Sequence, residues 1–188
     1  MADTKFTTGK GRFSYPHVFE PYASAEGQTA KYSTTFLIPK EDKETLRKLG
    51  DACKAVYEEH KNTTFKGILY EEVAKPYHDG DGRKPKGGEY GEECKGMWVL
   101  STSSKRKPLV VDRDRQTVTD ETAVYPGCYG RIAVNLYAYN VSGNRGIACG
   151  LNACQTFKYG EAFGGGASAD AFNDGFEDPD EDGDDLGL

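Results

Sequence analysis

The sequence predicts a mainly β fold: a β-barrel or half-open sheet with one prominent α-helix and a disordered acidic C-terminal tail. Several segments alternate apolar and polar residues with the two-residue period of strands, and glycines stand at several bends. A single segment has strong helical spacing. The end of the chain is acidic and glycine-rich, a composition that does not support a packed core.

Five segments carry the main strand pattern. Residues 31–40 place Tyr32, Thr34, Phe36 and Ile38 on one face. Residues 96–104 and 109–112 are predicted as shorter strands, joined by a basic turn. Residues 128–140 and 146–157 form two long runs around the turn sequence VSGNR, which predicts a hairpin.

One helix is predicted within residues 41–61. Its apolar residues recur at helical spacing, with acidic residues in the first turn and basic residues in the last, as the helix dipole favours. They are Leu46, Leu49, Cys53, Val56 and Tyr57. The polar, glycine-rich stretch 74–93 is predicted as a long surface loop.

Charge divides the chain into two parts. Residues 1–161 contain all 24 Lys and Arg but only 21 of the 30 Asp and Glu, a net charge of +3. Residues 162–188 contain the other nine acidic residues and no base, a net charge of −9. We therefore expect one folded domain over 1–161 and, over 162–188, a flexible linker and interaction tail.

The composition also suggests where the protein works. The N-terminus lacks the apolar stretch of a signal peptide, and no segment approaches the length of a membrane span. The five cysteines are an odd number without a CxxC pair, which indicates reduced thiols in a cytoplasmic protein.

The ending DPDEDGDDLGL begins like a calcium loop but does not complete one. Asp178, Asp180, Asp182 and Gly183 match positions 1, 3, 5 and 6 of an EF-hand loop, yet the required Glu would fall one residue beyond Leu188. No zinc spacing, phosphate-binding loop or nucleophile motif occurs either. We expect no cofactor, no metal and no catalytic residues.

A metal-dependent nuclease is the enzymatic alternative. Asp79 and Asp81 lie close together in one acidic segment and Asp112 and Asp114 in another, and clustered carboxylates can hold the divalent ions used in phosphodiester cleavage. Turn formation explains the same residues without chemistry. A third reading is a structural or decoy protein whose acidic tail mimics DNA.

Basic residues interleaved with aromatic residues form the recurrent pattern of the body, which has 12 tyrosines in all. Single-stranded nucleic acid is bound in this way, because cations follow the phosphates while rings stack on bases. Tyr137 and Tyr139 share the polar face of their strand with Arg131, which favours base stacking over simple packing.

The order of segments resembles a family of tailed-phage single-stranded-DNA-binding proteins with an OB-fold. The resemblance covers about residues 6–163. It is carried by GKGRFSYPHVFEP, YSTTFLIPK, KPYHDGDGR, WVLSTSSKRKPLVVD, YPGCYGRIAVNLYAYN and RGIACGLNACQTFKYGE. The helix follows an early strand rather than the middle strands of a simple OB-fold, so an elaborated OB-fold is implied.

The resemblance and the pattern together predict a non-enzymatic, largely sequence-independent binder of single-stranded DNA in phage replication, recombination or repair. The expected nucleic-acid-binding residues are Arg12, Tyr15, Lys75, Tyr77, Arg83, Lys84, Trp98, Lys105, Arg106, Lys107, Tyr129, Arg131, Tyr137 and Tyr139. The tail is expected to regulate binding and to recruit phage or host replication proteins through Asp178, Asp180, Glu181, Asp182, Asp184, Asp185, Leu186 and Leu188.

No membrane partner is expected. The sequence leaves open self-association as a homodimer or along DNA, the preference between DNA and RNA, and the number of nucleotides bound.

Overall fold

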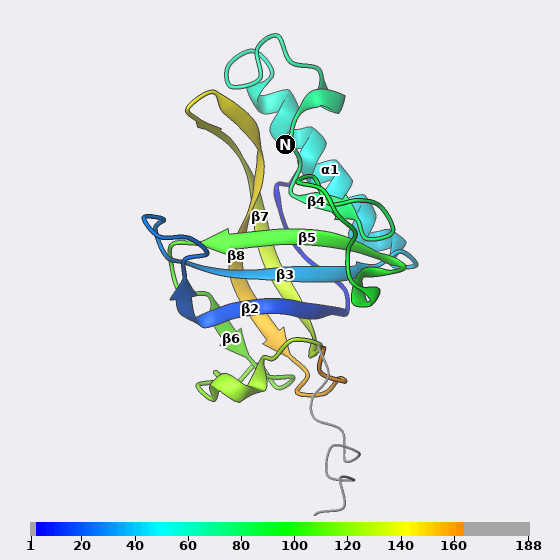
Figure 1. The fold of residues 1–188 in the computed structure, drawn as a ribbon, viewed down its shortest axis with the longest axis vertical. Helices are drawn as coiled ribbons and strands as arrows, with labels where there is room; N and C mark the ends of the chain where they lie inside the picture. Colours follow the sequence, from blue (N-terminus) through cyan, green and yellow to red (C-terminus); the bar gives the residue numbers. More distant parts are fainter. Residues whose placement is uncertain (1–2, 164–188) are drawn as a thin grey trace, which may run out of the picture.

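Five long strands form a sheet that closes on itself in the computed structural model, which describes residues 3–163 (Figure 1). They are β2 (Gly11–Tyr22), β3 (Lys31–Pro39), β5 (Met97–Ser104), β7 (Tyr129–Val141) and β8 (Asn144–Thr156). The pairings run β2–β3–β5–β8–β7, and β7 pairs with β2 to complete the ring. Within this ring β5 and β8 pair in parallel, and the other neighbouring strands pair antiparallel.

Three short strands extend this ring. β1 (Lys5–Thr7) pairs with β7, β6 (Leu109–Val111) lies parallel to β8, and β4 (Tyr77–Asp79) pairs with β5. Single 3₁₀ turns occur at Tyr70–Glu72, Glu92–Cys94 and Glu121–Ala123. The prediction of an unbroken loop over 74–93 was therefore wrong at β4, whose backbone groups pair with an edge of β5 that the sequence does not reveal.

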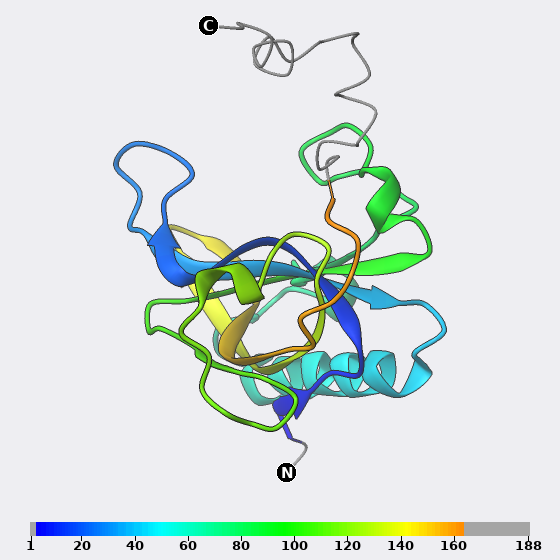
Figure 2. The same ribbon diagram turned by 90° about the horizontal axis from the view of Figure 1, so that it is seen from below.

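The helix α1 (Lys43–His60) lies against the outside of the ring, as Figure 2 shows. Asp42 caps it by accepting a hydrogen bond from the backbone N–H of Thr45 at 3.1 Å. Leu49, Cys53 and Val56 are buried beneath it, as their spacing predicted. The mainly β fold with one prominent helix is confirmed.

The main core fills the inside of the ring. Phe13 of β2 and Phe36 of β3 meet edge to face with ring centroids 5.4 Å apart, and both are fully buried. The predicted inward residues Ile132, Val134 and Leu136 join them. All five cysteines are free and buried.

A second, smaller apolar cluster lies on the outer side of β3 and β5. Leu37, Cys94 and Val99 are buried there, and Tyr90 and Phe163 pack against them. No helix of the described residues is long and apolar enough to cross a membrane. The predicted domain boundary at 161/162 falls at the edge of the described part, and the predicted tail residues lie outside it.

Candidate nucleic-acid interface

Small hydroxyl side chains form rows across the outer face of β2, β3 and β5. Ser14 stands opposite Thr35, and Thr35 stands opposite Ser101. One step along the strands, Ser33 stands opposite Ser103. Directly opposed residues share a face, so these side chains make a floor that is shallow and can form hydrogen bonds.

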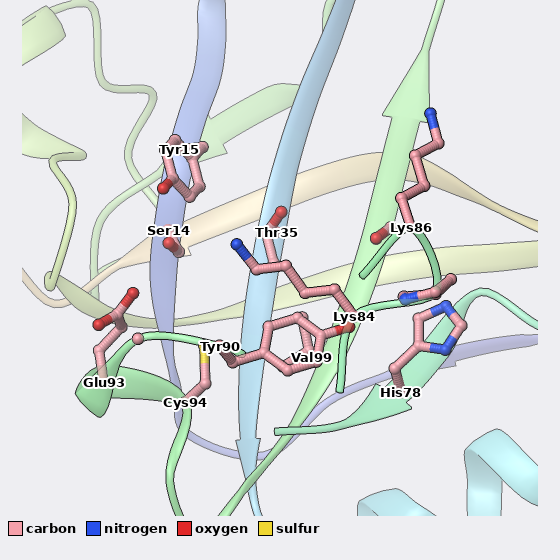
Figure 3. A pocket seen from close by; sticks show the side chains of 13 residues that line it. Ser14, Tyr15, Thr35, His78, Lys84, Lys86, Tyr90, Glu93, Cys94 and Val99 are labelled. Atoms are coloured by element: carbon pink, nitrogen blue, oxygen red, sulfur yellow. The ribbon is translucent and has the colours of Figure 1, made fainter. Parts of the chain in front are cut away.

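A cavity of about 540 Å³ opens over one end of this floor. Its floor is Ser14, Thr35 and Ser101, and the segment between β4 and β5 covers it (Figure 3). The side chains that surround the floor, shown in the same view, are Tyr15, His78, Lys84, Lys86, Tyr90, Glu93, Cys94 and Val99. We call this space the first cavity.

A second cavity of about 520 Å³ continues along the same face. Ser33 and Ser103 form its floor, and Lys31 and Lys105 stand at its sides. Tyr22 also lines it, 52% exposed and stacked on His17 with ring centroids 4.3 Å apart. The two cavities and the floor that joins them are called the groove below.

Tyr15 projects from a break in the regular pairing of β2. The register shifts between Ser14 and His17, and Tyr15 has a φ of 46°, in the left-handed region that non-glycine residues rarely adopt. Bulges of this kind redirect a side chain. Tyr15 is 70% exposed at the edge of the first cavity.

Burial sets the protonation of several groups in the first cavity. It lowers the pKa of His78, so this imidazole is neutral at pH 7, and it raises the pKa of the Tyr90 phenol and of the Cys94 thiol. The positive charge of this cavity therefore comes from Lys84 and Lys86 rather than from histidine.

Residues 80–96, which we call the finger, cover the first cavity and are tied down at their base. The ammonium group of Lys40 lies 2.7 Å from Asp79 Oδ1 and 2.6 Å from Asp81 Oδ2. Asp81 also accepts a hydrogen bond from the backbone N–H of Gly96 at 3.1 Å. Both ends of the finger are thus held by one ion cluster.

Three predicted binding residues line the groove: Tyr15, Lys84 and Lys105. Arg83 is exposed on the finger next to Lys84, and Arg106 is exposed next to Lys105. Lys107 is exposed as well, but it lines a separate cavity near β6.

Other predicted cations are already engaged by backbone carbonyl groups. Arg12 donates to the carbonyl oxygens of Gly127 and Glu161 at 2.9 and 2.6 Å, and Arg131 donates to that of Thr8 at 2.8 Å. Lys75 donates to the carbonyl oxygens of Tyr70 and Val73. These contacts assign the three side chains a structural part in the free protein.

The remaining predicted aromatic residues lie away from the two cavities of the groove. Tyr77 and Trp98 meet edge to face beside the main core. Tyr129 packs on Tyr159, and Tyr137 is 43% exposed on β7. Tyr139 lines a smaller cavity of about 280 Å³ that shares Ser101 and Ser103 with the groove.

Sequence reasoning missed the hydroxyl floor, the His17–Tyr22 pair and Tyr90. Alternation along 31–40 puts Ser33 and Thr35 on the face opposite Phe36 and Ile38, and no face was predicted for 96–104. That signal was available, but serine and threonine on a strand face carry no charge or ring to mark them as binding residues.

The carboxylates of the nuclease alternative do not form one site. Asp79 and Asp81 are paired with Lys40, whereas Asp112 Oδ1 accepts hydrogen bonds from the backbone N–H groups of Asp114 and Gln116 in a turn after β6. Within residues 3–163, no three His, Cys, Asp or Glu side chains are grouped to hold a metal ion.

Comparisons with known proteins place the chain among phage proteins. The family model described as "Enterobacter phage Enc34, ssDNA-binding protein" matches residues 4–186. Protein p50 of Acyrthosiphon pisum secondary endosymbiont phage 1 is 32% identical over 172 residues, which cover 87% of this chain and 89% of that protein.

Solved structures agree with the family match. The single-stranded-DNA-binding protein of bacteriophage Enc34 in complex with single-stranded DNA has 26% identity and a TM-score of 0.71, covering 86% of this chain and 90% of its own. Gp2.5, the single-stranded-DNA-binding protein of bacteriophage T7, has 16% identity and a TM-score of 0.54, covering 95% and 97%, and supports the fold alone.

The matching family is one of single-stranded-DNA-binding proteins and is non-enzymatic, in agreement with the prediction of a protein that is not an enzyme. The match to the family model spans nearly the whole sequence and includes every strand of the groove. The chain therefore belongs to the family of the single-stranded-DNA-binding protein of Enterobacter phage Enc34.

Proposed function

We propose that this protein binds single-stranded DNA along the groove and does so largely without regard to sequence. The observation that carries the proposal is the hydroxyl floor of β2, β3 and β5, with lysines beside both cavities and the exposed rings of Tyr15 and Tyr22 at its edge. Lysines attract the phosphates, and rings of this kind stack on any base.

The shape of the floor favours a single strand. Serine and threonine side chains are short, so a sugar–phosphate chain can lie close to the sheet and form hydrogen bonds with its hydroxyl groups. Successive rows of the floor are about 7 Å apart, because a strand rises by about 3.3 Å per residue. By binding DNA on this floor, the protein would coat and protect single strands during phage replication, recombination or repair in the host cytoplasm.

The acidic tail has two parts in the proposal. Its charge of −9 competes with DNA for the basic groove, since a tether gives the tail a high effective concentration there. Phe163, the last described residue, packs against the apolar cluster beside the first cavity, so the tail is attached at the edge of the groove. Once DNA displaces the tail, it recruits replication proteins.

Titration of the protein with labelled single-stranded DNA, duplex DNA and RNA tests the proposal. Single-stranded DNA should bind more tightly than duplex, and affinity should fall steeply with salt because bound lysines release counterions. The same series with magnesium or manganese should leave the DNA intact. Equal affinity for single strand and duplex, or no dependence on salt, would contradict the proposal.

A double variant, Lys84→Gln with Lys105→Gln, locates the binding surface. The slope of log affinity against log salt should decrease by about 0.7 for each lost phosphate contact. Lys54→Gln is the control, because Lys54 is exposed on α1 and lines neither cavity of the groove. An unchanged slope in the double variant would mean that DNA binds to a surface other than the groove.

A further inference from the structure

Glu93 places a carboxylate in a groove that is otherwise suited to a polyanion. It lines the first cavity and is half-buried (Figure 3). Among residues 3–163 it has no salt bridge and no side-chain hydrogen bond, although its neighbour Glu92 pairs with Lys95 at 2.8 Å. A carboxylate repels phosphate. Glu93 must therefore either contact another part of a bound nucleotide, such as the base, or weaken the binding of DNA.

The local backbone determines where the Glu93 side chain starts and leaves room for it. Glu93 lies in the 3₁₀ turn Glu92–Cys94, and its side chain folds back over Gly91, where an added Cβ would collide with the carboxylate oxygens. Cys94, which follows it, is buried in the small apolar cluster. The burial of Cys94 thus constrains the backbone next to Glu93, and Gly91 leaves the space that the Glu93 carboxylate occupies.

The side chains that line the first cavity with Glu93 include groups that can contact a nucleobase. Tyr90, which packs against the buried Val99, offers an aromatic ring on which a planar base can lie, and Tyr15 offers an exposed ring at the edge of the cavity. The phenol of Tyr90 remains neutral because burial raises its pKa. A base held here would meet the carboxylate with one of its polar edges.

The bases differ in what they present to a carboxylate, which only accepts hydrogen bonds. Guanine carries two adjacent donors, N1–H and the N2 amino group, and can bind both carboxylate oxygens. Cytosine and adenine place one amino group beside a ring nitrogen that accepts. Thymine has one N–H between two carbonyl oxygens, which the carboxylate repels. In a single strand these edges are not used for pairing.

We propose that the first cavity is a base-binding subsite in which the Glu93 carboxylate selects guanine over thymine. The inference rests on the proposed function, because it requires single-stranded DNA in the groove. It refines that function: the lysines and the remaining rings stay indifferent to sequence, while one position along the bound strand has a preferred base.

The test compares short thymidine oligonucleotides with and without one central deoxyguanosine. The parent protein should bind the guanosine oligonucleotide at least about fivefold more tightly, the lower end of what a bidentate contact discriminates. Deoxyinosine, which keeps N1–H but lacks the N2 amino group, should give an intermediate affinity.

Glu93→Gln should abolish the guanosine preference and bind the all-thymidine strand more tightly, because the repelling charge is gone. Glu92→Gln is the matched control: it removes the same charge one residue away, outside the cavity, and should keep the preference. Equal affinities for the two oligonucleotides in the parent, or a preference that survives in Glu93→Gln, would overturn the proposal. Failure of the parent to bind any single strand would instead overturn the proposed function.

Discussion

At the scale of single residues, small side chains decide where the groove can be. Ser14, Thr35 and Ser101 keep the outer face low, and Gly80 lets the finger approach the strands. An added Cβ at Gly80 would collide with the carbonyl oxygen of Cys94 and lie 2.7 Å from that of Met97. Backbone atoms on both sides leave no room for relaxation.

Two glycine substitutions should therefore have opposite effects on stability. Gly80→Ala should lower the free energy of unfolding by more than about 1 kcal/mol, because the clash is with backbone. Gly50→Ala, in the middle of α1 with no atom within 4 Å of the added Cβ, should raise it by about 0.5–1 kcal/mol. Urea unfolding measures the free energy of unfolding of both variants. A Gly80→Ala protein with the same free energy of unfolding as the parent would contradict the packing described for the finger.

At the scale of elements, the finger is a separate piece of chain attached to the sheet by few groups. Lys40 lies just beyond β3, Asp79 ends β4, and Asp81 begins the finger. Hydrogen bonds to Lys40 lower the pKa of both carboxyl groups below the ordinary value of 3.8 and raise the pKa of Lys40 above 10.5. The ion cluster is hence fully formed at neutral pH.

The sign of these shifts predicts how the finger responds to acid. Groups with a lowered pKa stabilise the fold above their unfolded pKa and lose that contribution as pH falls through the lower folded value. The backbone N–H of Gly96 should lose its bond to Asp81 below about pH 3.8, visible as a change in its NMR shift.

Lys40→Gln should release the finger already at neutral pH. The backbone amide of Gly96 should then exchange its hydrogen faster, while amide exchange in α1 should change little. Lys95→Gln is the control, since Lys95 also lies on the finger but, among residues 3–163, forms its salt bridge with the exposed Glu92 and none with Asp79 or Asp81. Slow exchange at Gly96 in Lys40→Gln would mean that packing of Cys94 and Tyr90 alone holds the finger.

At the scale of the whole molecule, opposite charges are separated along the chain. The body carries +3 and residues 162–188 carry −9. The groove lies on the body, and the chain leaves the described part at Phe163, beside the first cavity. The acidic segment is thus attached where it can compete with DNA.

Deletion of residues 165–188 should tighten binding to single-stranded DNA, most clearly at low salt, where electrostatic competition is strongest. It should also weaken recruitment of replication proteins. The matched control is a full-length chain in which the acidic residues of the tail are replaced by their amides, which should bind like the truncated protein. Equal affinity of full-length and truncated protein at low salt would count against competition by the tail.

Local pattern was sufficient to determine much of this protein. Alternation and extended runs identified β3, β5, β7 and β8, and helical spacing and charge identified α1, while the division into body and tail stays a prediction. These features depend on neighbours within a few residues, so they can be read without the fold. The order of segments carried the resemblance to the family, which the comparisons confirmed.

Only the tertiary structure decided which side chains share the groove. Arg12, Lys75 and Arg131 were expected to bind phosphate, but carbonyl groups distant in the sequence accept from Arg12 and Arg131, and nearby ones accept from Lys75. Ser14, Thr35 and Ser101 come from three strands and meet through pairing alone. A site of this kind depends on register and packing between remote segments, which residue type and local spacing do not encode.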